Sequence, residues 1–103
     1  MYGLRDSDIA SIQQVMKKFP EVESAWLYGS RAKGTQKHGS DVDIAVKGKD
    51  ITRETILQIR VILNEEVPLP YHFDVTNYQS IQKEDLKDHI TRVGQLIYQA
   101  SRI

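Results

Sequence analysis

The feature that most constrains the fold is the stretch from Trp26 to Val46, in which two short apolar runs enclose a basic, polar segment. The first run, residues 24–29, is rich in aromatic residues and ends at a glycine, Gly29. The second run, residues 41–46, alternates acidic and apolar residues as D-V-D-I-A-V. Short runs of this kind, bounded by glycine and polar residues, are typical of strands. The stretch therefore predicts two strands, joined by a helical turn at residues 30–33 and a loop.

Three helices are expected around these strands, each marked by apolar residues three or four positions apart. The first has a capping residue at Ser7 or Asp8 and cannot continue past Pro20. The second begins after Thr52, and the third runs from Glu84 to near the C-terminus. Their inward faces are predicted to consist of Ile9, Ile12, Met16 and Phe19, of Ile56, Ile59 and Leu63, and of Leu86, Ile90, Val93 and Ile97.

Additional apolar residues and one glycine modify the second and third of these helices. Leu57, Val61 and Ile62 widen the apolar face of the second helix, so this helix is expected to be well buried. Gly94 lies inside the pattern of the third helix and weakens it by about 1 kcal/mol relative to alanine.

A third strand is predicted at residues 71–76. The order of elements is then helix, strand, helical turn, strand, helix, strand, helix. This order predicts an α/β (α+β) fold, in which a small mixed sheet is flanked by helices. A chain of 103 residues buries one core, so residues 1–103 are expected to form a single domain.

The composition argues against several classes of protein. Lys and Arg number 14, as do Asp and Glu, so the formal net charge is zero and no extended nucleic-acid surface is expected. The chain has no cysteine, which excludes disulfides and thiolate metal sites. No apolar stretch approaches the roughly 20 residues that span a bilayer, and the N-terminus lacks the apolar core of a signal peptide. The expectation is a cytoplasmic protein that does not enter a membrane.

Asp41 and Asp43 are the first candidates for a catalytic metal site. Alternation along the predicted strand places both carboxylates on one face, while Val42 and Ile44 point into the core. Adjacent carboxylates repel one another unless a cation neutralises them, and Mg²⁺ takes one or two carboxylates together with substrate phosphates. If the third strand lies beside the second, Asp74 joins this pair as a third ligand or takes the proton of an attacking hydroxyl.

Gly29 and Ser30 are the candidate phosphate-binding turn. Glycine allows the backbone to approach a phosphate closely, and the hydroxyl of Ser30 can donate to a phosphate oxygen. Arg31 or Lys33 can neutralise the charge on a leaving pyrophosphate. Nucleotidyl transfer depends mainly on positioning and electrostatics of this kind.

None of these features is specific by itself. Many D-x-D pairs and Gly-Ser turns are ordinary exposed segments, and an aspartate such as Asp74 is often structural. Their combined order along the chain makes a metal-dependent nucleotide site the favoured interpretation. Of the histidines, His38 in the loop is the one expected to touch substrate, whereas His72 and His89 are expected to be structural or solvated.

The Gly-Ser turn, ten intervening residues and the Asp-Val-Asp run together resemble the GS-x10-D-x-D signature of the DNA polymerase β-like nucleotidyltransferase superfamily. The longer string GSRAKGTQKHGSDVDIAV resembles the minimal nucleotidyltransferases, the MNT group, and the resemblance covers most of the chain. It implies the polymerase β-like fold, with Asp41, Asp43 and Asp74 as metal-binding and catalytic carboxylates. It also implies that Gly29 and Ser30 hold the triphosphate of ATP, with two Mg²⁺ ions as cofactor.

Minimal nucleotidyltransferases are commonly encoded beside a HEPN-domain protein. In characterised pairs the HEPN protein is an RNase toxin, and the MNT protein is its antitoxin, which transfers AMP from ATP to a tyrosine of the toxin. The resemblance therefore implies a protein adenylyltransferase with a HEPN toxin as partner. The chain is expected to lack the helical domain with which larger relatives hold antibiotics or nucleic acids. A partner protein filling that gap is consistent with a homodimer or a heterotetramer.

Two other functions are compatible with the same residues. One is a non-catalytic antitoxin that neutralises its partner by contact, with the nucleotide site vestigial or regulatory. The other is a small-molecule nucleotidyltransferase that acts on an aminoglycoside-type alcohol. Neutralisation that survives Asp41→Asn and Asp43→Asn would favour the first, and activity on a small acceptor without a partner would favour the second.

Overall fold

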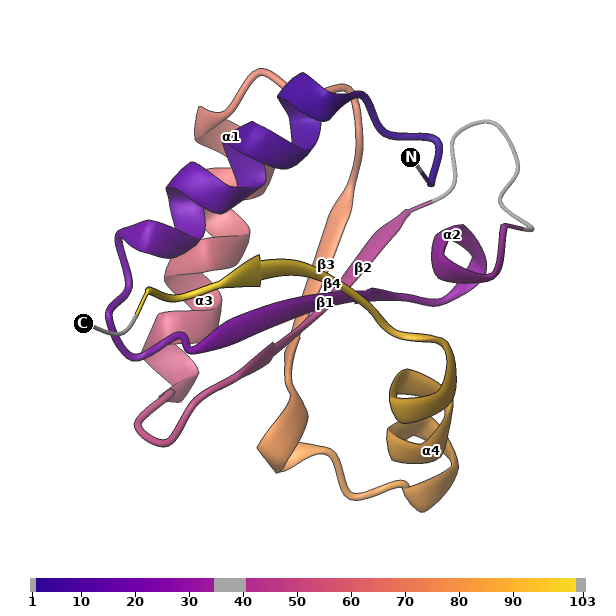
Figure 1. Ribbon diagram of the computed structural model, residues 1–103. Coiled ribbons are helices and arrows are strands. Elements are labelled where there is room, and N and C mark those ends of the chain that lie inside the picture. Colours follow the sequence, from indigo (N-terminus) through magenta and orange to yellow (C-terminus); the bar gives the residue numbers. More distant parts are fainter. Residues whose placement is uncertain (1, 35–40, 102–103) are drawn as a thin grey trace.

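The computed structural model describes residues 2–34 and 41–101. Helices and strands alternate along most of this chain (Figure 1). Their bounds are α1 Asp6–Lys17, β1 Ser24–Tyr28, α2 Ser30–Lys33, β2 Val42–Lys47, α3 Arg53–Val61 with a π-helical turn at Ile62–Glu66, β3 Phe73–Asn77, a 3₁₀ turn at Tyr78–Ser80, α4 Glu84–Val93 and β4 Gln95–Gln99.

The four strands form one mixed sheet in the order β3-β2-β1-β4. β1 pairs antiparallel with both β2 and β4, whereas β2 and β3 are parallel. The parallel pair follows from the crossover through α3, because a strand can return in the same direction only after such a connection. The prediction of a small mixed sheet flanked by helices is confirmed.

Helices cover the two faces of the sheet unequally. α1 and α3 cover one face, where the main core contains Val42, Ile44 and Val46 of β2 at 0% exposure. α4 covers part of the other face with a small apolar cluster of Tyr28, Ala45 and Ile90. Figure 1 shows α4 apart from α1 and α3, on the other side of the strands. Alternation along β2 therefore places Asp43 on the α4 face, together with Ala45.

The N-terminal cap of α1 differs from the prediction. Arg5 is the capping residue, and Asp8 in the first turn accepts the backbone N–H of Arg5 at 3.0 Å. Asp8 also accepts hydrogen bonds from the Arg5 guanidinium and from the hydroxyl of Tyr71, the latter at 2.8 Å. Asp8 therefore satisfies the backbone N–H of the capping residue from a position in the first turn of α1. The predicted cap of α3 is confirmed, since Thr52 Oγ1 accepts the backbone N–H of Thr55 at 3.1 Å.

The expectation of a helix extending to Ile97 is wrong. α4 ends at Val93, and residues 95–99 form β4 on the edge of the sheet beside β1. Gly94 marks the change, because a β-carbon there would collide with the carbonyl oxygen of Ile90. Ile97 is buried as predicted, but as a strand residue, while Leu96 next to it is 47% exposed. Pairing with the free edge of β1 outweighs the helical spacing of the apolar residues.

α3 and the π-helical turn that continues it, predicted as a well-buried helix, are buried on one side only. Ile59 and Leu63 are fully buried, whereas Leu57 and Val61 are 47% and 46% exposed.

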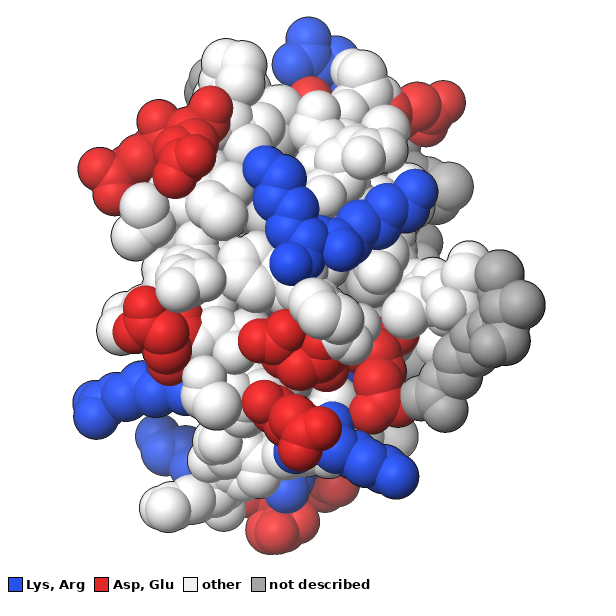
Figure 2. Space-filling model, turned by 90° about the vertical axis from the view of Figure 1, so that its left-hand side faces the viewer, with Lys and Arg blue, Asp and Glu red and all other residues white. Residues whose placement is uncertain are grey.

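Figure 2 shows the side of the molecule that carries α1 and α3. Acidic and basic side chains are interspersed there with wide uncharged areas, and the described residues form no broad basic surface on this side. None of the described helices is long and apolar enough to cross a membrane.

Candidate active site

A row of three residues crosses the sheet on the α4 face. Tyr28 at the end of β1 pairs with Asp43 in β2, and Asp43 pairs with Asp74 in β3. Because the three strands are in register here, the two carboxylates leave neighbouring strands at the same level and on the same face. The turn at residues 29–30 follows Tyr28 directly. The predicted phosphate turn and these two predicted carboxylates are thus brought together.

Asp43, in the middle of this row, is half-buried. Burial raises the pKa of its carboxyl above the ordinary value, and the nearby carboxylates of Asp74 and Asp41 raise it further. The guanidinium of Arg31 acts on the same pKa in the opposite direction. Carboxylates crowded in this way favour a bound cation, because the cation removes their mutual repulsion.

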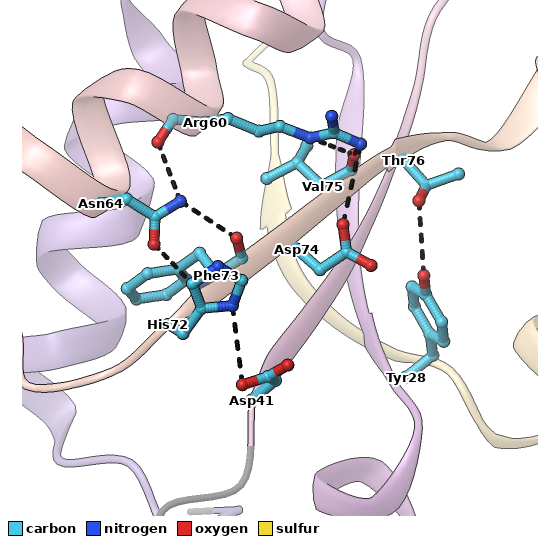
Figure 3. Close-up of polar contacts among 9 residues, drawn as sticks. All are labelled: Tyr28, Asp41, Arg60, Asn64, His72, Phe73, Asp74, Val75 and Thr76. Carbon is cyan, nitrogen blue, oxygen red and sulfur yellow. Dashed lines mark hydrogen bonds and ion pairs between the residues drawn. The ribbon is translucent and has the colours of Figure 1, made fainter.

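Asp41 stands just before β2 and is exposed. One of its carboxylate oxygens, Oδ1, lies 3.5 Å from Nδ1 of His72 (Figure 3). The backbone N–H of Val42 donates to the carbonyl of His72 at 2.9 Å, which extends the pairing of β2 and β3 by one residue. His72, which was expected to be structural or solvated, is exposed and lies beside a predicted metal ligand.

Asp74 is reached by an arginine from the other side of the strand. Arg60 of α3 extends around the outer edge of β3, and its Nη2 lies 3.6 Å from Oδ1 of Asp74 (Figure 3). The same guanidinium donates to the carbonyl of Val75 from Nε at 3.1 Å and from Nη2 at 2.8 Å. Arg60 therefore fixes both the backbone and the carboxylate at this point of β3.

Asn64, in the π-helical turn, binds the same outer edge of β3 at Phe73, just before Asp74. Its side-chain amide donates to the carbonyl of Phe73 at 3.0 Å and accepts the backbone N–H of Phe73 at 2.8 Å. The amide imitates a neighbouring strand, which satisfies an edge that would otherwise be open. π-helical turns are rare and occur frequently at functional sites. Here the turn is associated with the strand that carries Asp74.

Gly29 lies close to the carboxylate of Asp43. Its φ of +77° and ψ of −154° lie in a region that is essentially restricted to glycine. A β-carbon at this position would collide with Oδ2 of Asp43. The backbone N–H of Gly29 donates to Nε2 of His89 on α4 at 3.2 Å. The ring of His89 also packs edge-on against Tyr28, with 6.3 Å between the ring centroids.

The two basic residues that follow the turn differ in their surroundings. Arg31 is 4% exposed, donates to the carbonyl of Tyr2 at 3.1 Å and lies 5.1 Å above the ring of Tyr71. Its side chain is therefore buried, and its positive charge opposes the rise in the pKa of Asp43. Lys33 at the end of α2 is exposed. The loop residue His38 lies outside the described residues.

The carboxylates do not form a closed metal site by themselves. Within residues 2–34 and 41–101, no group of three or more His, Asp or Glu side chains is placed to hold an ion. Asp43 and Asp74 form an open pair at the surface, with Asp41 two residues before Asp43. Such an arrangement suits an ion that takes part of its ligands from a substrate phosphate.

Arg60 and His89 were not predicted to belong to this site, and His89 was expected to be structural or solvated. Both come from helices that precede or follow the strands, and both reach the site through side-chain bonds across the fold. The spacing of Arg60 on its helix identifies it only as a polar residue next to the buried Ile59. Its role depends on the position of β3 relative to α3, which local patterns do not specify.

Solved structures with a similar fold include several toxin–antitoxin complexes. One, a toxin–antitoxin with AMP-PNP, has a TM-score of 0.73 and 22% identity over 94% of this chain and 75% of that one. The MntA-HepT toxin–antitoxin has a TM-score of 0.71 and 17% identity over 93% and 74% of the two chains. A protein from Shewanella oneidensis has a TM-score of 0.71 and 14% identity over 94% and 74%. At these identities, the likeness shows the fold alone.

A search of the curated proteins finds no match. The family model described as polymerase beta, nucleotidyltransferase, matches residues 10–103, which is nearly the whole chain and includes the carboxylate row and the Gly-Ser turn. The chain therefore belongs to the polymerase beta nucleotidyltransferase family.

Proposed function

We propose that this protein transfers AMP from ATP, with Mg²⁺, to a hydroxyl group of a partner protein. The acceptor is a tyrosine of a HEPN-domain toxin in the cytoplasm, and the transfer neutralises the toxin. The observation that carries the proposal is the in-register pair of Asp43 and Asp74 beside the Gly29–Ser30 turn. The similar fold of toxin–antitoxin structures, one with AMP-PNP, supports a toxin as partner and ATP as substrate.

The Gly-Ser turn and α2 bind the triphosphate in this proposal. The hydroxyl of Ser30 donates to a phosphate oxygen, and Gly29 keeps the backbone close enough for that contact. The exposed ammonium of Lys33 neutralises the leaving pyrophosphate. Arg31 is buried, so it contributes through its charge on Asp43 rather than by reaching toward the leaving group.

The carboxylates fit a divalent cation. Burial and the neighbouring carboxylates raise the pKa of Asp43, so positive charge at this point relieves an existing repulsion. Asp41 and Asp43 would hold one Mg²⁺, with Asp74 completing the set for a second ion. Bound there, Mg²⁺ would neutralise phosphate charge. Since the described carboxylates form an open set, we expect calorimetry to show tight Mg²⁺ binding only when an ATP analogue is present.

The chemistry follows from the position of Asp74 at the edge of the row. The acceptor hydroxyl oxygen attacks the α-phosphorus of ATP, and its proton passes to the carboxylate of Asp74. A new bond forms between that oxygen and phosphorus while the bond to the pyrophosphate oxygen breaks. AMP remains on the acceptor and pyrophosphate leaves. Arg60 keeps Asp74 in place, because it is bound to both the carboxylate and the adjacent backbone.

Mass spectrometry tests the proposal. The protein is incubated with the protein encoded by the neighbouring gene, ATP and Mg²⁺, and the intact mass of that neighbour is measured. A shift by one or more AMP groups supports the proposal, and Asp43→Asn should abolish the shift. An unmodified neighbour, with a known nucleotidyltransferase active under the same conditions, would contradict it. Neutralisation of the toxin by Asp43→Asn to the same extent as by the wild type would instead indicate an antitoxin that acts by contact.

A further inference from the structure

A cleft of about 560 Å³ opens beside the strand edge that carries Asp74. It lies between α3, the end of β3 and the 3₁₀ turn that follows β3. Val75 and Thr76, the two residues that follow Asp74, are part of its wall. Its volume falls within the range of about 300–1,000 Å³ that is usual for binding pockets. The carboxylate row and the phosphate turn described above do not line it.

The lining of the cleft combines apolar, neutral polar and positively charged side chains. Two arginines, Arg53 and Arg60, stand on its wall together with apolar side chains such as Leu57 and Ile81. The described residues that line it include no carboxylate and no aromatic ring. Arg60 is already paired with Asp74, which lies outside the cleft, whereas no described ion pair engages Arg53. Positive charge on a wall that has no carboxylate of its own favours an acidic ligand. Single-stranded nucleic acids are usually held by aromatic rings that stack on the bases, so this lining favours a protein segment.

Arg60 connects the cleft to the catalytic row. Arg60 is one of the residues that line the cleft, and its guanidinium lies 3.6 Å from Asp74 and donates to the carbonyl of Val75. Its side chain is 44% exposed, so a ligand in the cleft can reach it. A carboxylate on that ligand would compete with Asp74 for Arg60. A ligand in the cleft would therefore affect the proposed base, Asp74, directly.

From this arrangement we infer that the cleft holds an extended, acidic segment of the acceptor protein. The inference rests on the proposed function and adds to it a recognition site for the acceptor. The acidic side chains of the segment pair with Arg53 and Arg60, and its apolar side chains lie against Leu57 and Ile81. The modified hydroxyl belongs to the part of the segment that passes over the edge of β3 to Asp74.

Fluorescence polarisation tests the inference in the absence of ATP and Mg²⁺. The probes are short labelled peptides of alternating tyrosine and glutamate, with glutamine or lysine replacing glutamate as controls. The acidic peptide should bind most tightly and should bind more weakly as salt is added. Arg53→Glu should weaken its binding about tenfold, because an attraction becomes a repulsion. An acidic residue in the first turn suits a helix, so α3 should remain folded, as circular dichroism can verify.

Arg92→Glu is the matched control. Arg92 lies on α4, is exposed and does not line the cleft, so the same change of charge there should leave peptide binding unaltered. Equal binding of the acidic and neutral peptides, or equal effects of the two variants, would overturn the inference. So would an oligonucleotide that binds more tightly than the acidic peptide and depends on Arg53.

The assay separates this inference from the proposed function. AMP transfer to the partner that is indifferent to Arg53→Glu would refute the acceptor cleft and leave the proposed function standing. Arg53-dependent binding of the acidic peptide without AMP transfer to any protein would refute the proposed function and leave the cleft as a binding site for acidic segments.

Discussion

Gly29 and Asp43 lie so close together that a β-carbon at Gly29 would collide with Oδ2 of Asp43. The first residue belongs to the predicted phosphate turn and the second to the predicted metal site. Because Gly29 has no side chain, the carboxylate of Asp43 can occupy its position beside the turn. The Gly-Ser and D-x-D parts of the motif act as one structural unit across β1 and β2.

Gly29→Ala should damage the site more than Gly34→Ala. Both glycines have a positive φ, +77° and +76°, but only the conformation of Gly29 lies in the region essentially reserved for glycine. Nothing lies within 4 Å of a β-carbon built on Gly34. We expect Gly34→Ala to cost about 1 kcal/mol of stability and Gly29→Ala about 3 kcal/mol. Urea denaturation measures both values.

The same two variants distinguish the effect of backbone strain from that of displacing the Asp43 carboxylate. AMP transfer by folded Gly29→Ala should fall at least about 100-fold, because Asp43 must move. Gly34→Ala should retain most of its activity. Similar activity losses in the two variants would show that the contact with Asp43 has no particular importance.

Asp43→Asn should make the protein inactive but slightly more stable at neutral pH. Burial, Asp74 and Asp41 raise the pKa of Asp43, so its ionised form destabilises the native state. The gain in the free energy of unfolding should be at most about 1 kcal/mol at this partly exposed site. It should shrink as the pH falls through the raised native pKa toward the ordinary value near 4, because protonated Asp43 is then also neutral. Urea denaturation at a series of pH values checks the sign; a variant less stable than the wild type at pH 7 would contradict it.

Asp8→Ala should show the opposite dependence on pH. Asp8 is 1% exposed, and its hydrogen bonds to Arg5 lower the pKa of its carboxyl. The wild type gains stability from this group above the ordinary aspartate pKa and loses it as the pH falls through the lowered native value. Replacing Asp8 should reduce the free energy of unfolding by about 2 kcal/mol at pH 7, the value of hydrogen bonds to a charged group. A difference from wild type that stays constant down to acidic pH would contradict this account.

His89→Phe should weaken the binding of ATP. The phenyl ring can keep the edge-on contact with Tyr28, but it cannot accept the N–H of Gly29. Loss of one neutral hydrogen bond is worth about 1 kcal/mol, so the KM for ATP should rise about fivefold while kcat changes less. His89→Gln keeps an acceptor and should restore part of the affinity. A purely structural role would lower stability and leave the ratio of kcat to KM of the folded protein unchanged.

The central part of the fold could be predicted because it depends on local patterns. The alternation from Asp41 to Val46 determines which side chains enter the core, and Gly29 ends the preceding strand. Asp74 could be placed beside Asp43 on the condition that β3 neighbours β2, which the structure confirms.

The parts that could not be predicted depend on contacts between distant residues. Ile97 fits a helical stripe and a strand equally well, and the free edge of β1 decides between them. The positions of Arg60 and His89 follow from how α3 and α4 pack on the sheet. The sequence suggests Arg31 as a cation for the leaving pyrophosphate, but Tyr2 and Tyr71 hold its side chain in a buried position.

The central claim is that Asp43 and Asp74 form one catalytic centre for AMP transfer. The most direct measurement compares the rate of AMP transfer to the partner protein for wild type, Asp43→Asn, Asp74→Asn and the double variant. Each single variant should be at least about 100-fold slower, and the double variant should be about as slow as the worse single variant, because residues that act as a unit are not additive. Either single variant retaining most of the wild-type rate, or losses that multiply in the double variant, would contradict the claim.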